Sequence, residues 1–253
     1  MIVIAGYGYV GKAIDEALSQ HEHVEIVDPA VNDNRVCTFG VDAESVIIAV
    51  STPEAPDGSC YMQNVYDVLD DCPQVPILLK STISIDGWKE LKLRYPNKEI
   101  TFSPEFLRAI TATEDFANQP CVFLGGGNID YWQSFFVNIL GKVSTVSTPE
   151  ELILAKYFRN SFLATKVTFF NQMYDLCDQL DIDYEQVKSV VTADNRIGHS
   201  HSEVTKERGY GGHCLPKDTQ ALVQSALHNG CSLSLLREVI RYNKKIQKSS
   251  EHE

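Results

Sequence analysis

Residues 1–14, MIVIAGYGYVGKAI, decide the fold, because a short apolar run leads directly into the glycine pattern GYGYVG. Gly6, Gly8 and Gly11 have the GxGxxG spacing, after a predicted strand and at the start of a predicted helix. In that setting the first glycine allows a tight turn, the second lets the backbone approach a pyrophosphate, and the third lets helix and strand pack closely. The stretch therefore predicts a βαβ opening that binds a dinucleotide, although glycines at this spacing can also serve only to shape a turn.

An acidic residue stands where a dinucleotide-binding fold needs one. Asp28 follows Gly6 by 22 residues and ends the predicted strand VEIVD. Its carboxylate can accept hydrogen bonds from a ribose diol and would repel a 2′-phosphate, so the sequence favours NAD over NADP. Arg35, in the polar segment NDNR, is the residue that could offset this preference.

The first 147 residues alternate between apolar β-branched runs and helical periodicity, a pattern typical of strands buried on both faces of a parallel sheet. The predicted strands are residues 2–4, 24–28, 45–50, 76–81, 99–103, 121–125 and 142–147. We therefore predict an α/β fold whose N-terminal domain, residues 1–147, is a Rossmann-type doubly wound parallel sheet.

No convincing strand pattern follows residue 147. The segment PEELILAKYFRNSFLATKVTFFNQMYDLCDQL predicts one helix of about 30 residues, with Pro149 in its first turn. Shorter helices are predicted at 183–192, 216–229 and 232–247. Residues 148–253 are thus expected to form an all-α domain built on the long helix.

The long helix also predicts self-association. It would span about 45 Å and expose apolar residues such as Phe169 and Phe170, which a small domain does not readily cover. We expect a homodimer through this helix. Burial of the whole helix within its own chain is the alternative.

Composition argues against several classes of function. The 253 residues carry a formal charge of -12, so nonspecific attraction to nucleic acid or to an anionic membrane is not expected. No apolar run approaches the roughly 20 residues that span a bilayer, and the N-terminus has no secretion signal. Seven cysteines without a CxxC pair indicate reduced thiols and no metal site. We expect a soluble, cytoplasmic protein.

The stretch GYGGHCLPKD, residues 209–218, contains a candidate nucleophile. Pro216 suits the first turn of a helix, so Cys214 would lie at or just before a helix N-terminus. Backbone N–H groups and nearby cations can lower the pKa of a thiol there. Asp218, four residues further on, would project near it. A helix cap with a buried thiol is the alternative interpretation.

Further polar groups are predicted at the ends of strands and on the long helix. Lys156 and Asn160 share a helix face, where a lysine could hold an oxyanion, although a solvated surface lysine is as ordinary. Glu105, Thr52 and Thr82 each follow a predicted strand, at the edge where ligands of open α/β sheets bind. Each of the three could also be only a turn residue.

Seven motifs, taken in order, resemble those of the UDP-glucose/GDP-mannose dehydrogenase family. They are GYGYVG, STPEAPDGS, KSTIS, SPEFLR, AKYFRNSFLATKVTFFNQM, DNRIG and GYGGHCLPKD. The resemblance covers residues 1 to about 245. It implies an NAD-dependent enzyme that oxidises the 6-hydroxyl of a nucleotide sugar to a carboxylate in two hydride transfers. UDP-glucose, giving UDP-glucuronate, is the substrate that it suggests first.

The resemblance also implies catalytic roles. Cys214 resembles the nucleophile that forms a thiohemiacetal and then a thioester. Lys156 and Asn160 resemble groups that stabilise negative oxygen, and Asp218 resembles a group that positions water. Glu105 matches the glutamate that serves as acid and base in thioester hydrolysis.

Two sets of ligand contacts are expected by the same resemblance. The cofactor set is Gly6, Gly8, Tyr9, Val10, Gly11, Asp28, Ser51, Thr52, Pro53, Thr82 and Lys217. The substrate set is Phe106, Leu107, Arg108, Lys156, Asn160, Arg196, Tyr210, Gly211 and Gly212. Thr82 is also expected to contact the catalytic water, and Arg196 corresponds to an arginine that reaches the substrate across a dimer interface in relatives.

Relatives in this family usually continue into a second Rossmann-like domain that grips the nucleotide half of the substrate, whereas this sequence stops at Glu253. Several alternatives therefore stay open. They are weak UDP binding, another nucleotide sugar or a smaller hydroxy substrate, a pocket completed by another chain or by dimer contacts, and a non-catalytic NAD-binding subunit.

Overall fold

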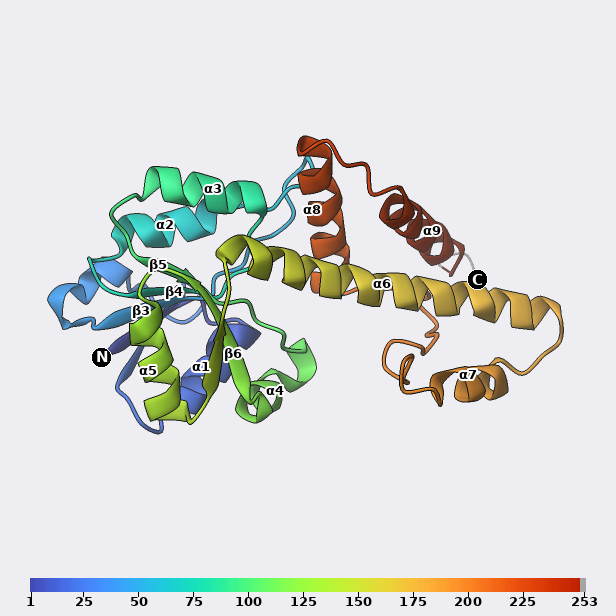
Figure 1. Cartoon of the computed structure of the whole chain (residues 1–253), viewed down its shortest axis with the longest axis horizontal. Helices are drawn as coiled ribbons and strands as arrows, with labels where there is room; N and C mark the ends of the chain where they lie inside the picture. Colours follow the sequence, from blue (N-terminus) through green and yellow to red (C-terminus); the bar gives the residue numbers. More distant parts are fainter. Residues whose placement is uncertain (251–253) are drawn as a thin grey trace. The chain divides into compact units, whose positions relative to one another are not determined.

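The computed structural model describes residues 1–250, which form two compact units (Figure 1). The first unit contains Met1–Ala55 and Cys60–Lys156. The second contains Pro56–Ser59 and the chain from Tyr157 onward. The domain boundary at residue 147 stays a prediction.

A seven-stranded sheet forms the centre of the first unit, in the order β2-β1-β3-β4-β5-β6-β7. The strands are β1 (Ile2–Ala5), β2 (Val24–Val27), β3 (Ser45–Ile48), β4 (Ile77–Leu79), β5 (Ile100–Phe102), β6 (Cys121–Gly126) and β7 (Val143–Val146). Every predicted strand is present, with ends within two residues of those expected. The short apolar runs thus identified the strands correctly.

Two strands, β6 and β7, run opposite to the direction expected for the parallel sheet that we predicted. β6 pairs antiparallel with β5, with Thr101 opposite Gly126, and β7 runs parallel to β6. The connection from β5 to β6 contains η3 (Ala109–Thr111) and α4 (Ala112–Asn118). A parallel pairing usually needs a crossover helix that returns the chain along the whole strand, and the seven residues of α4 rise only about 10 Å. The fold is therefore α/β with a mostly parallel sheet.

Helices cover both faces of the sheet (Figure 1). α2 (Gln63–Asp71) and α3 (Ile85–Arg94) lie over one face, whereas α1 (Tyr9–Leu18), α4 and α5 (Ile129–Leu140) lie over the other. Two 3-10 helices, η1 (Val36–Thr38) and η2 (Gly40–Asp42), precede β3. The core beneath α1, α4 and α5 includes buried residues of strands and helices alike, among them Ile4, Ile47, Leu78, Leu18, Phe116 and Trp132.

The second unit is helical. The 31-residue helix α6 (Pro149–Gln179) begins in the first unit and continues through the second. The unit also contains α7 (Tyr184–Thr192), α8 (Cys214–His228) and α9 (Ser234–Ser250), so all the predicted helices are present. Within residues 1–250, no helix combines the length and the apolar character needed to cross a bilayer.

Two buried clusters hold the other segments of the second unit against α6. Val167 packs with Tyr210 and Val239, and Phe170 packs with Tyr184. Phe169 is 51% exposed, as predicted, but the predicted exposure of Phe170 is wrong, because only 3% of it is exposed. Consecutive helical residues point about 100° apart, so the two rings cannot share one environment.

A short segment from early in the sequence belongs to this second unit. Pro56–Ser59 packs on α8, where a Cβ on Gly58 would lie 3.0 Å from Gln220 Nε2. Gly58 also has a φ of +82°, which L side chains rarely adopt. The close approach of this segment to α8 therefore depends on glycine.

Candidate active site

The glycine-rich loop connects β1 to α1, and its three glycines do three different things. Gly6 has a φ of +96°, and a Cβ on it would lie 2.5 Å from the carbonyl carbon of Ala49, just after β3. A Cβ on Gly11 would lie 2.0 Å from the Gly6 carbonyl oxygen, so no side chain fits there. Nothing lies within 4 Å of a Cβ built on Gly8. That open side, at the N-terminus of α1, is where a pyrophosphate would bind.

Asp28 is fixed beside this loop. It directly follows β2, and the order β2-β1-β3 makes β1 the switch point at which ligands of α/β sheets bind. Asp28 Oδ2 accepts the N–H of Tyr7 at 2.6 Å, and Oδ1 accepts the N–H of Ala30 at 2.8 Å. A carboxylate has about four lone-pair positions. Two therefore remain for a ribose diol.

The loops after β3 and β4 are bound to each other. Thr52 is buried, and its Oγ1 donates to the carbonyl of Thr82 at 2.7 Å. Ser51 and Pro53, on either side of Thr52, are exposed. Asn64 of α2, which the sequence analysis did not single out, donates to the Ser51 carbonyl at 2.9 Å. A hydrogen bond thus links the predicted cofactor residues Thr52 and Thr82 at the carboxyl ends of β3 and β4.

A buried ion pair joins the loop after β5 to the first turns of α6. Lys156 Nζ lies 2.5 Å from Glu105 Oε1 and donates to the Glu105 carbonyl at 2.8 Å, with both side chains less than a tenth exposed. The Tyr9 hydroxyl of α1 lies 3.4 Å from the same Oε1. Oε2 accepts the N–H of Leu107 at 2.8 Å. Lys156 is therefore not a solvated surface lysine, and Glu105 is more than a turn residue.

Opposing effects set the pKa of Glu105. Burial raises it, whereas the Lys156 ammonium, the Leu107 N–H and the ammonium of Lys80 lower it. The lowering prevails, so this pKa lies below its ordinary value and the carboxylate is ionised at neutral pH. An ionised Glu105 can accept a proton from water. Lys156, which uses two of its three donors on Glu105, has one N–H left for another oxygen.

The two residues after Glu105 are predicted to contact substrate, and both pack within the first unit. The Phe106 ring lies edge-on to Phe123, with 5.7 Å between ring centroids. Leu107 packs against the apolar core beneath α1. Both are only partly buried, so their predicted contact with substrate stays open.

Two predicted substrate arginines are exposed and bound to acidic neighbours. Arg108 lies 2.6 Å from Asp115 within the first unit. Arg196 lies 2.5 Å from Asp194 in the second unit, and 89% of its side chain is exposed. Neither arginine is buried, so each can exchange its acidic partner for an anionic ligand at low cost.

Cys214 is the first residue of α8, as the position of Pro216 predicted. Its side chain is partly exposed, which argues against a fully buried cap. Gly211 and Gly212, just before it, are exposed, and nothing lies within 4 Å of a Cβ built on Gly212. The chain that leads to the thiol is therefore open on one side.

Two predicted residues, Asn160 and Lys217, bind one buried carboxylate in the second unit. Asp218, on α8, is 1% exposed. Its Oδ2 accepts a bond from Asn160 Nδ2 at 2.6 Å, and its Oδ1 accepts one from Lys217 Nζ at 2.7 Å. Cys214 precedes Asp218 by one helical turn. This group provides a thiol, an amide and a buried acid within a single unit.

Amide side chains that the sequence analysis did not single out fix the loop before Cys214. The Tyr210 N–H donates to Asn243 Oδ1 at 2.7 Å, and the Tyr210 carbonyl accepts bonds from Asn243 and Gln247, each at 2.9 Å. The Gly209 N–H donates to Asn171 Oδ1 at 2.9 Å. The Tyr210 ring lies in the core between α6 and α9, where burial raises the pKa of its phenol to about 12. Any substrate contact at Tyr210 remains a prediction.

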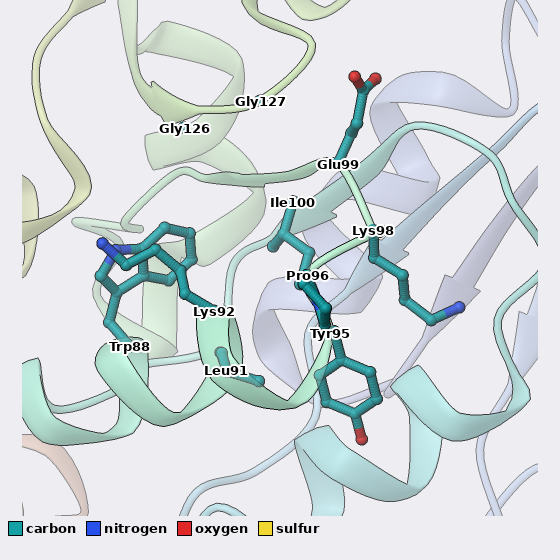
Figure 2. Close-up of a pocket in the computed structure, with 10 residues that line it drawn as sticks. All are labelled: Trp88, Leu91, Lys92, Tyr95, Pro96, Lys98, Glu99, Ile100, Gly126 and Gly127. Carbon is teal, nitrogen blue, oxygen red and sulfur yellow. The ribbon is translucent and has the colours of Figure 1, made fainter.

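A pocket of about 430 Å³ in the first unit lies apart from all the predicted site residues. Figure 2 shows Trp88 and Lys92 together on one side, with the side chains of Tyr95 and Glu99 directed opposite ways. Its two lysines already have protein partners, since Lys92 donates to Glu150 and Lys98 donates to a main-chain carbonyl. We therefore do not place the substrate there.

The family model and the curated relatives point to the same family. Residues 151–245 match the central domain of the UDP-glucose/GDP-mannose dehydrogenase family. A UDP-glucose 6-dehydrogenase of Rickettsia felis is 32% identical over 222 residues, covering 80% of this chain and 48% of the relative. The UDP-glucose 6-dehydrogenase of Pseudomonas aeruginosa is 32% identical over 220 residues, with 78% and 48% covered. This chain thus spans about half the length of these relatives.

The fold agrees with that of a solved relative. The structure of a UDP-glucose dehydrogenase from Pyrobaculum islandicum superposes with a TM-score of 0.84 at 24% identity, over 96% of this chain and 68% of that one. The chain contains the glycine-rich loop, the buried Glu105–Lys156 pair and a cysteine at a helix N-terminus. Its sequence and its fold both match UDP-glucose dehydrogenases. The chain belongs to the UDP-glucose/GDP-mannose dehydrogenase family.

Proposed function

We propose that this chain acts as an NAD-dependent nucleotide-sugar 6-dehydrogenase, with UDP-glucose as first candidate substrate and UDP-glucuronate as product. The observation that carries the proposal is the buried Lys156–Glu105 pair, which lies in the same unit as the glycine-rich loop and contacts α1 through Tyr9. A buried cation and carboxylate beside a dinucleotide loop suit an oxidation that creates negative oxygen and consumes water.

The residues present fit NAD. Gly8 leaves room for the pyrophosphate at the N-terminus of α1, and Asp28 presents a carboxylate to the adenosine ribose. Thr52 and Thr82 would line the nicotinamide side, on loops fixed by their mutual hydrogen bond. When bound, NAD supplies the hydride acceptor for both oxidation steps.

The side chains then divide the chemistry. Oxidation of the 6-hydroxyl gives an aldehyde, and the Cys214 thiolate adds to its carbonyl carbon to form a thiohemiacetal. Lys156 and Asn160 donate hydrogen bonds to the oxygen that becomes negative. Loss of the second hydride leaves a thioester on Cys214.

Hydrolysis completes the proposed reaction. Glu105 accepts a proton from the attacking water, and Asp218 helps to position that water. Attack on the thioester carbon breaks the carbon–sulfur bond, which releases the sugar acid and returns the Cys214 thiolate. The ionised state of Glu105 at neutral pH is the state that this role requires.

The proposal includes a homodimer through α6. The helix exposes a series of large apolar side chains, each 50% to 67% exposed, namely Phe158, Phe162, Phe169 and Leu176. Phe162, Phe169 and Leu176 are seven residues apart and so lie on one face. A second copy would bury that face. Arg196 would then reach the substrate of the partner.

A stoichiometric assay tests the function. The chain is incubated with NAD and, separately, with UDP-glucose, GDP-mannose and a simple hydroxy acid, while NADH is followed by absorbance and the product by mass spectrometry. Two NADH per sugar, together with the sugar acid, are expected. One NADH per sugar contradicts the thioester route. Measurable NAD binding with no turnover of any substrate favours a non-catalytic NAD-binding subunit.

A further inference from the structure

A second buried lysine, Lys80, lies close to the Glu105–Lys156 pair and has no part in the chemistry described above. It directly follows β4 and is 3% exposed. Its Nζ donates to Ser103 Oγ at 3.1 Å and lies 3.5 Å from the carbonyl oxygen of Pro104. These two residues immediately precede Glu105. The Lys80 ammonium therefore holds the turn that presents the Glu105 carboxylate.

Backbone hydrogen bonds between neighbouring strands also fix the position of Lys80. The Lys80 N–H donates to the Ile48 carbonyl at 2.8 Å, and the Ser103 N–H donates to the Leu79 carbonyl at 2.9 Å. The ends of β3, β4 and β5 are thereby in register at the point where the lysine turns toward Ser103. The contact is built into the sheet, because a shift of any one strand would break it.

The charged and titratable groups around Glu105 come from four elements. Lys156 comes from α6, Lys80 from the end of β4, and the Tyr9 hydroxyl from α1, while Glu105 itself follows β5. Burial lowers the pKa of Lys80 to about 8, with Glu105 opposing this shift and Lys156 adding to it. Two ammonium groups thus face a single carboxylate in a buried environment.

An ammonium is a costly way to hold a turn. The oxygens that Lys80 contacts belong to a hydroxyl and a carbonyl, both neutral, and a buried cation without an adjoining anion is unfavourable. The nearby Glu105 carboxylate is what offsets that cost. The charge of Lys80 and the charge of Glu105 therefore stabilise each other.

We propose that Lys80 is a positioning residue for Glu105, which orients the Ser103–Pro104–Glu105 turn and, together with Lys156, favours the ionised Glu105 carboxylate used in thioester hydrolysis. The role in hydrolysis rests on the proposed function, whereas the effect of Lys80 on the charge of Glu105 does not. Loss of the ammonium removes a positive charge near Glu105, so the protonated form of the acid becomes easier to form.

The chain offers a matched control. Lys142, just before β7, is also buried and donates to two main-chain carbonyls, those of Ala117 at 2.9 Å and Gln119 at 2.7 Å. Burial lowers the pKa of Lys142 as well. It differs from Lys80 in having no contact with the turn of Glu105, so Lys142→Met measures the general cost of removing a buried lysine.

The test is a carbon-13 NMR titration of the Glu105 carboxyl carbon in glutamate-labelled protein, with the resonance assigned by Glu105→Gln. Lys80→Met should raise the pKa of Glu105, whereas Lys80→Arg and Lys142→Met should leave it near the wild-type value. In the wild type, the same resonance should show a second, small inflection where Lys80 loses its proton. An unchanged pKa in folded Lys80→Met overturns the proposal.

Two further outcomes are separable. If Lys80→Met does not fold, the wild-type titration decides, because absence of the second inflection overturns the proposal without any variant. If the wild type shows no turnover, the proposed function fails while the titration still reports on Lys80. With turnover, the acid limb of the hydrolysis rate should move to higher pH in Lys80→Met and stay in place in Lys80→Arg.

Discussion

Asn160 Nδ2 donates a 2.6 Å hydrogen bond to Asp218 Oδ2, and this bond links α6 to α8 within the second unit. Asp218 is fully buried and also holds Lys217. We expect Asp218→Ala to lower the free energy of unfolding by about 2–4 kcal/mol, because it leaves two donors without their acceptor. Urea unfolding followed by circular dichroism measures this. Asp178→Ala, at an exposed position of α6, should cost less than about 0.5 kcal/mol.

The glycine-rich loop gives a prediction that separates binding from stability. Gly8→Ala places a methyl group in open space and should leave the unfolding midpoint nearly unchanged, yet weaken NAD binding at least about tenfold by blocking the pyrophosphate. Gly11→Ala meets the Gly6 carbonyl oxygen and should destabilise the fold itself. Calorimetric NAD titration and thermal unfolding of both variants distinguish the two effects. Equal loss of stability in both would contradict this assignment.

The thiol of Cys214 is expected to carry the second oxidation. Cys214→Ser should reduce turnover to the acid by about a hundredfold or more, since a hydroxyl is a far weaker nucleophile than a thiolate. Rapid-quench analysis should show no protein-bound sugar in the variant. Cys231→Ser, at an exposed cysteine in the same unit, is the control and should behave as wild type. Full activity of Cys214→Ser would remove the thiol from the mechanism.

The Glu105–Lys156 pair predicts how stability depends on pH. The pKa of Glu105 is lower in the folded chain than its ordinary value of 4.5, so its contribution is present above pH 4.5 and is lost as pH falls through the folded pKa. The wild type should therefore lose stability in acid more steeply than Glu105→Gln. Urea unfolding between about pH 3 and pH 7 checks this. Parallel curves for the two proteins would show that the pair makes no such contribution.

The exposed face of α6 predicts the oligomeric state. Replacing Phe162 and Phe169 together with glutamate puts two charges on a face that a second copy would bury, and should convert a dimer to a monomer. Sedimentation velocity measures the change. The control is Leu93→Glu, at an 82% exposed leucine of α3, which should leave the mass of the sedimenting assembly unchanged. A wild type that sediments as a monomer would refute the dimer.

Local pattern was enough for the elements but not for their directions. The apolar runs predicted each strand, because a strand buried on both faces consists almost entirely of apolar residues. Pro149 and Pro216 predicted the helix starts. Strand direction depends on the length of the connection between two strands, not on the residues of the strand. The run CVFLG therefore does not indicate that β6 is antiparallel to β5. Phe170 was misjudged for a related reason. A helix that is apolar on several sides does not reveal which ring faces inward.

The sequence predicted those site residues whose role follows from residue type and spacing. It did not predict those whose role depends on being buried in the folded chain. Glycines at fixed spacing and a cysteine before a helical proline have recognisable roles in any context. Lys80 ends an apolar run, where a lysine ordinarily marks the return to solvent, and its burial is a product of the sheet. Asn243 and Asn171 bind the loop before Cys214 only because tertiary packing brings them next to it. No local sequence pattern predicts these contacts.

The second unit is discontinuous along the chain, since Pro56–Ser59 belongs to it and packs against α8 at Gln220. A fragment begun anywhere after residue 59 would therefore lack a piece of its own surface and leave that part of α8 bare. Truncation or recombination between the two units therefore cannot yield a complete second unit. The two parts are expected to be inherited, expressed and exchanged together.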